Sequence, residues 1–75
     1  MSPTPVISAR QLVGVLNRLG FGEIRSHGSH HRFAHPDGRK TTVPIHPGRD
    51  IPKGLLHKIV TLDLQMTMDE FTELL

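Results

Sequence analysis

The apolar residues of this chain change their spacing at Gly20, and this change limits the possible folds more than any other feature. Before it, four apolar residues recur at the spacing of one helix face: Leu12, Val15, Leu16 and Leu19. Ser8 and Gln11 fit a capping box, and Gly20 fits the left-handed residue that often follows a helix. These signals predict a helix over residues 8–19.

Beyond Gly22 the pattern is that of short strands separated by turns. Residues 23–27, 30–35 and 39–44 are the strand segments, with turns at Gly28-Ser29 and at Pro36-Asp37-Gly38. With Phe33 facing the core, alternation puts His31 and His35 on its side. The other face of that strand then carries His30, Arg32 and Ala34. With Ile24 and Val43 also inward, four neighbours point outward: Arg25, His27, Lys40 and Thr42.

The last third of the chain predicts two further helices. Asp50 is placed to cap the first of them, with Pro52 in its first turn. Lys53 and Lys58 of this helix stay in solvent, and its apolar side comprises Leu55, Leu56, Ile59, Val60 and Leu62. Thr67 and Glu70 form a second capping box, ahead of Phe71, Leu74 and Leu75. The predicted order is α-β-β-β-α-α.

A chain of 75 residues supports one domain. We expect residues 1–7, which contain two prolines, to form a flexible arm and residues 8–75 to form the domain. Because a three-stranded antiparallel sheet buries one face, the helices cover that face and leave the other for a partner. The expected fold is therefore α+β and resembles that of double-stranded-RNA-binding domains.

Composition narrows the chemistry. The chain has no cysteine, which excludes disulfides, thiolate metal sites and cysteine nucleophiles. No apolar run is long enough to span a membrane and no secretory signal is evident, so we expect a cytoplasmic protein. All nine Lys and Arg lie in residues 10–58, whereas the charged residues among 59–75 are all acidic. This asymmetry favours a polyanionic partner for the first part.

The segment from His27 to His31 allows three chemistries. A metal site is disfavoured, because His30 and His31 point to opposite faces and no carboxylate lies between Gly28 and Pro36. A Ser29 nucleophile is disfavoured because no nearby acid orients an imidazole. Proton transfer on RNA remains, since the ribose 2′-hydroxyl is itself the nucleophile and an imidazole titrates near neutral pH. It needs neither a metal nor a cofactor.

Three ordered motifs resemble the HicA family of toxin–antitoxin systems. They are Gly28-Ser29-His30-His31, His35-Pro36-Asp37-Gly38-Arg39 and Val43-Pro44-Ile45-His46, with Leu19-Gly20-Phe21 before them and Ile51-Pro52-Lys53-Gly54-Leu55-Leu56 after them. The resemblance covers residues 8–75. It implies a toxin that cleaves mRNA and is inhibited by a HicB-type antitoxin.

The resemblance also implies that the histidine of the Gly-Ser-His motif, His30, is catalytic. His31, Ser29 and His27 are candidate auxiliary residues. Arg25, Arg32 and Lys40 are the candidate RNA-binding residues. Two alternatives stay open. One is a module that shares the basic face and binds RNA or DNA without cutting it; the other is an interaction protein that docks a partner through its acidic last helix and apolar residues.

Overall fold

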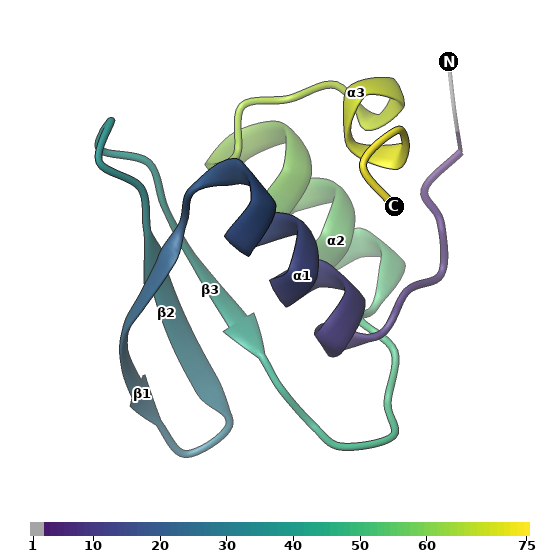
Figure 1. Cartoon of the computed structure of the whole chain (residues 1–75). Helices are drawn as coiled ribbons and strands as arrows, with labels where there is room; N and C mark the ends of the chain where they lie inside the picture. Colours follow the sequence, from purple (N-terminus) through teal and green to yellow (C-terminus); the bar gives the residue numbers. More distant parts are fainter. Residues whose placement is uncertain (1–2) are drawn as a thin grey trace.

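The computed structural model describes residues 3–75 and has the predicted order of elements (Figure 1). The elements are α1 (Ala9–Leu19), β1 (Gly22–His27), β2 (His30–Ala34), β3 (Lys40–Pro44), α2 (Lys53–Lys58), a π-helical turn η1 (Ile59–Asp63) and α3 (Met68–Thr72). Residues 1 and 2, part of the expected arm, lie outside the described residues. No helix within residues 3–75 combines the length and the apolar character needed to cross a bilayer.

Helix α1 begins and ends as predicted. The Ser8 hydroxyl accepts the Gln11 N–H at 3.1 Å, and the Gln11 side chain accepts the Ser8 N–H at 2.9 Å. At the other end Gly20 has φ +99°, and the Phe21 N–H donates to the Leu16 carbonyl. Residues adjacent to the helix in sequence therefore form the capping hydrogen bonds at both of its ends.

The sheet is antiparallel with strand order β1-β2-β3. Phe33 and Val43 are buried on its inner face, together with Thr41, which lies opposite Phe33. On the outer face His30, Arg32 and Ala34 lie opposite Pro44, Thr42 and Lys40, respectively. The predicted alternation along β2 is confirmed.

Strand β1 departs from the prediction at Ile24. The pairing places Glu23 opposite Phe33 but Arg25 opposite Arg32, so Ile24 is an extra residue that has no partner. Its side chain is 55% exposed. The expectation that Ile24 faces the core is wrong, because a β-bulge resets the alternation of an edge strand. Arg25 and His27 are nevertheless on the outer face, because the bulge precedes them.

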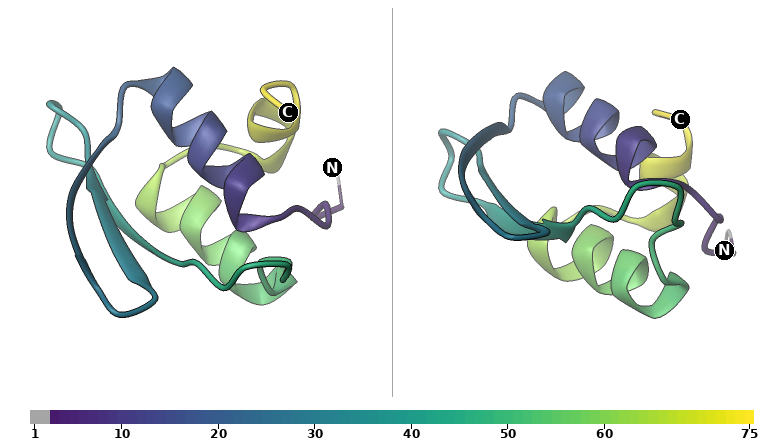
Figure 2. Two further views of the ribbon diagram at one scale, coloured as in Figure 1. Left: turned by 60° about the horizontal axis from the view of Figure 1, so that its bottom comes forward. Right: turned by 90° about the horizontal axis from the view of Figure 1, so that it is seen from below.

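The helices gather on the β3 side of the sheet, and α3 lies at the end of the helical layer farthest from the strands (Figures 1 and 2). The core between helices and sheet includes Leu12 and Leu16 of α1, Phe33 of β2 and Leu56 of α2, each at most 1% exposed. The fold class is thus α+β, with the architecture of a double-stranded-RNA-binding domain.

The segment before α2 differs from the prediction. Pro52 occupies the N-cap of α2 and no side chain caps that end, so the expectation that Asp50 caps the helix is wrong. Asp50 instead pairs through its backbone with Ser8, and the Ile51 N–H donates to the Ile7 carbonyl at 2.9 Å. Ile7 is 2% exposed, so packing begins within the segment expected to be an arm.

The turn η1 changes which residues face the core. The Leu64 N–H donates to the carbonyl of Ile59, five residues earlier, instead of four. This wider turn rotates the following side chains relative to an α-helix. Leu62 is therefore 65% exposed and Leu64 is fully buried, which corrects the expectation that Leu62 belongs to the apolar side.

Helix α3 begins with the predicted capping box. The Thr67 hydroxyl accepts the Glu70 N–H, and the Glu70 carboxylate accepts the Thr67 N–H at 2.9 Å. This backbone hydrogen bond lowers the pKa of Glu70 below its usual value. Phe71 and Met68 complete the core at this end.

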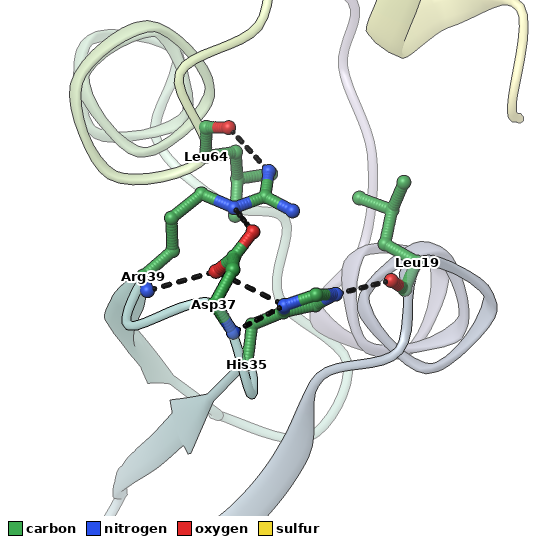
Figure 3. A network of polar contacts seen from close by, with 5 residues as sticks. All are labelled: Leu19, His35, Asp37, Arg39 and Leu64. Atoms are coloured by element: carbon green, nitrogen blue, oxygen red, sulfur yellow. Dashed lines mark hydrogen bonds and ion pairs between the residues drawn. The ribbon is translucent and has the colours of Figure 1, made fainter.

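The β2–β3 hairpin is fastened to two helical segments by His35, Asp37 and Arg39, which we call the hairpin clasp (Figure 3). His35 Nε2 lies 3.0 Å from the Leu19 carbonyl, and its Nδ1 accepts the Asp37 N–H. Arg39 donates to the Asp37 carboxylate at 2.8 Å and to the Leu64 carbonyl at 2.7 Å. The clasp thus joins the end of α1 to the end of η1.

Aromatic contacts reinforce the hairpin clasp. The rings of Phe21 and His35 meet edge to face with centroids 5.1 Å apart. On the same ring, the Arg39 guanidinium lies 5.2 Å from the Phe21 centroid. Phe21 is 3% exposed, so these contacts are shielded from water.

Two glycine substitutions are expected to change stability in opposite directions. A Cβ at Gly20 would lie 3.1 Å from His35 Nε2 in a backbone of φ +99°, so Gly20→Ala should lower the free energy of unfolding by about 1–2 kcal/mol. A Cβ at Gly54 of α2 meets nothing within 4 Å, so Gly54→Ala should raise it by up to about 1 kcal/mol. Urea unfolding followed by circular dichroism measures both; equal effects would contradict the local geometry.

The hairpin clasp also predicts a pH dependence. The backbone N–H of Arg39 donates to the Asp37 carboxylate and is the main cause that lowers the pKa of Asp37 below its ordinary value of 3.8. The hydrogen bond from the Arg39 side chain lowers this pKa further. A carboxyl whose pKa is lower in the folded state stabilises above its unfolded pKa, and this stabilisation is lost as the pH falls through the folded pKa. Wild-type stability should therefore fall more steeply below about pH 4 than that of Asp37→Asn. Glu73→Gln is the control, and an unchanged slope for Asp37→Asn would refute the coupling.

Candidate nucleic-acid interface

His30 stands at the start of β2, directly after a tight turn. Gly28 has φ +60° at the first of two turn positions, as a type II′ hairpin requires. The Ile45 N–H donates to the Ser29 carbonyl at 2.7 Å, which ties the turn to the segment after β3. His30 itself is exposed and lies opposite His27 on β1. Its imidazole therefore projects from a fixed backbone into solvent.

Five side chains define what we call the basic face: Arg25, His27, His30, Arg32 and Lys40. Strand register places all of them on the outer side of the sheet. Arg25 lies directly opposite Arg32, a pairing of like charges that is unfavourable unless an anion lies between them. Among residues 3–75, no carboxylate forms an ion pair with Arg25, Arg32 or Lys40. The basic face thus has unneutralised positive charge.

The outer sheet face is bounded on the β3 side by α2 and η1. A groove of about 480 Å³ lies between the sheet and these two helical segments, and we call it the β3–α2 groove. It is lined by His30, Arg32, Lys40, Thr41, Thr42, Pro44, Leu55, Lys58, Ile59 and Asp63. Three of the residues predicted to act on RNA, His30, Arg32 and Lys40, therefore share one concave surface, while Arg25 and His27 extend it across β1.

Two charged residues of the β3–α2 groove were missed by sequence reasoning. Lys58 was expected only to stay in solvent, and Asp63 had no predicted role. In the structure Asp63 accepts a hydrogen bond from the Thr41 hydroxyl at 2.9 Å, which links η1 to β3. No local motif connects a helix residue with a strand residue some twenty positions earlier, so only the packed fold brings them together.

His31 and Ser29 are separated from the basic face. His31 lies on the inner side of β2, where its Nδ1 is inaccessible to solvent and 3.3 Å from the Glu23 carboxylate, without hydrogen-bond alignment. Ser29 is half-buried in the turn, and its carbonyl is engaged by Ile45. Neither residue lines the β3–α2 groove, whereas His27, the third auxiliary candidate, faces His30 across the strand pair.

The remaining histidines lie elsewhere. His35 belongs to the hairpin clasp, and His46 lines a different hollow together with Arg10 and Arg49. His57 is exposed on α2 and does not line the β3–α2 groove. Over residues 3–75, no three His, Cys, Asp or Glu side chains come together as metal ligands could.

The arrangement fits proton transfer beside a phosphate. An exposed imidazole can give or accept a proton near neutral pH, and the guanidinium and ammonium groups around it can bind an anion. His30 and Arg32 are two positions apart on the same strand face, so one ligand can meet both.

Comparison with known proteins identifies a family for this chain. No curated protein sequence matches the chain. A family model described as the HicA toxin of bacterial toxin–antitoxin matches residues 9–65, which span α1, the whole sheet, α2 and η1. Because this match covers most of the chain, the protein belongs to the HicA toxin family.

Proposed function

We propose that the protein is an endoribonuclease toxin that cleaves mRNA, with His30 as its catalytic general acid or base. The observation that most directly supports this function is that His30 is exposed within the basic face and also lines the β3–α2 groove. The family membership supports the toxin role and an antitoxin partner. RNA is the substrate that this small set of side chains suits best, because it contains its own nucleophile.

The proposed reaction is an internal transesterification. The 2′-oxygen attacks the adjacent phosphorus, the bond from phosphorus to the 5′-oxygen breaks, and a 2′,3′-cyclic phosphate and a 5′-hydroxyl are formed. A base removes the 2′-hydroxyl proton, and an acid gives a proton to the leaving 5′-oxygen. His30 carries one of these protons, while His27 or water carries the other. No step of this reaction requires a metal ion or a cofactor.

The cations of the basic face act on the phosphate. Arg25, Arg32 and Lys40 hold the backbone and stabilise the negative charge that develops on the phosphorane-like transition state. Arg32 is partly fixed, because its Nη1 lies 3.4 Å from the Thr42 hydroxyl. A guanidinium held in this way can donate further hydrogen bonds to phosphate oxygens.

Replacing His30 tests the catalytic assignment. His30→Ala should lower the rate of RNA cleavage by about 10²–10⁴-fold, because a positioned proton carrier is lost. His57→Ala is the matched control, since His57 is also an exposed histidine but lies outside the groove. Cleavage of labelled RNA and growth arrest are measured, with thermal unfolding to show that each variant folds. Undiminished activity of folded His30→Ala would remove His30 from the mechanism.

The same basic face also fits a module that holds RNA or DNA without cutting it. Incubation of labelled RNA with the protein in EDTA separates the two functions. Products formed in EDTA support the nuclease, and stable binding without products supports the module.

We further propose that a HicB-type antitoxin inhibits the toxin in the cytoplasm by covering the basic face with its own carboxylates. The unneutralised charge of Arg32 and Lys40 supports this mode, since acidic side chains can replace the phosphates of RNA.

Charge reversal tests this mode of inhibition. Arg32→Glu with Lys40→Glu should weaken the antitoxin complex severalfold, mainly by slowing association, because steering charges are inverted. Arg18→Glu with Arg10→Glu on α1 is the control of equal charge change. Binding is measured by surface plasmon resonance at two salt concentrations. If both pairs of substitutions weaken the complex equally, the antitoxin does not act through the basic face.

A further inference from the structure

We propose that the β3–α2 groove holds one unpaired nucleotide of the RNA beside His30, and that Lys58 of α2 contacts its phosphate. This inference rests on the proposed function for its substrate class and adds a strand preference and a binding residue to it. The groove, and not the flat part of the sheet, then determines which RNA can bind productively.

The two walls of the groove offer positive charge from opposite directions. Arg32 and Lys40 project from the sheet, and Lys58 belongs to the helix across from them. Lys58 is exposed, and no carboxylate in the described part of the chain forms an ion pair with it. A phosphate between the walls can therefore be contacted from both sides, which a flat surface does not allow.

The groove also has an apolar lining. Pro44, Leu55 and Ile59 contribute to it, next to the hydroxyl-bearing Thr42. Its volume of about 480 Å³ lies within the range of roughly 300–1,000 Å³ that is typical of small-molecule sites. A groove of this volume has room for a nucleotide, with the base against the apolar side chains and the sugar and phosphate toward the charged walls.

Only an unpaired nucleotide can present a base in this way. In an A-form duplex the base faces are stacked on one another, and proteins reach mainly phosphates and 2′-hydroxyls. In a single strand the base can turn out of the stack and pack on protein side chains. The β3–α2 groove therefore favours single-stranded RNA, even though the fold resembles that of domains that bind duplexes.

Asp63 places a negative charge in one part of a groove whose other charged residues are basic. Its carboxylate is fixed by the Thr41 hydroxyl and is the acidic residue among the lining side chains. A phosphate is repelled from this point and attracted toward Lys58, Lys40 and Arg32. The phosphate then lies within the same concave surface as the His30 imidazole.

Binding of a non-cleavable RNA tests the groove independently of catalysis. A 2′-O-methyl oligonucleotide cannot be cleaved by its own 2′-oxygen, so affinity is measured by fluorescence anisotropy with the wild-type protein and with Lys58→Ala. Lys53→Ala is the matched control, because Lys53 is an exposed lysine of the same helix that does not line the groove. The same oligonucleotide annealed to its complement is the duplex probe.

We expect Lys58→Ala to weaken single-strand binding severalfold and to reduce the slope of log K against log salt by about 0.7, the loss of one phosphate contact. Lys53→Ala should change neither quantity, and the duplex should bind more weakly than the single strand. Equal effects of the two substitutions, or tighter binding of the duplex, would overturn the inference. Tight groove-dependent binding by a protein that leaves unmodified RNA intact would instead refute the nuclease function alone.

Discussion

The burial of Phe33 in the centre of β2 is the constraint on which the rest of the structure depends. β2 pairs on both sides, so its orientation fixes that of β1 and β3. With Phe33 1% exposed, period-2 alternation sends His30 and Arg32 to the opposite face. A slip of one residue would bury these polar side chains and expose Phe33, at a cost of several kcal/mol. The burial of Phe33 thus determines on which face of the sheet the candidate catalytic residue His30 lies.

The helical layer contributes side chains to the candidate site from α2 and η1, the segments that lie beside β3. Helix α2 and the turn η1 complete the core with Leu56 and Leu64, and on their outer side they bring Lys58 and Asp63 to the β3–α2 groove. The π-turn matters for both tasks, because the same rotation buries Leu64 and leaves Asp63 against Thr41. Stability and the shape of the candidate site therefore depend on the same short segment.

The histidines of this small domain lie in two different kinds of surroundings. His35 has both ring nitrogens engaged and fastens the β2–β3 hairpin to α1, so its role is structural. His30 and His27 are exposed and face each other across two strands, where their nitrogens are free to meet a ligand. The spacing of the histidines in the sequence does not distinguish these two groups. The number of hydrogen-bond partners around each imidazole ring does.

Local sequence determined both ends of α1, the start of α3, the turns and the alternation of β2, because capping boxes, turn glycines and period-2 patterns act between near neighbours. It thereby also predicted that His30 and Arg32 share the outer face. Only the tertiary structure decided that Ile24 bulges outward, that Leu64 replaces Leu62 in the core and that Lys58 lines the same groove as Arg32 and Lys40. None of these follows from the spacing of apolar residues, because each depends on an irregularity of the backbone or on packing between elements.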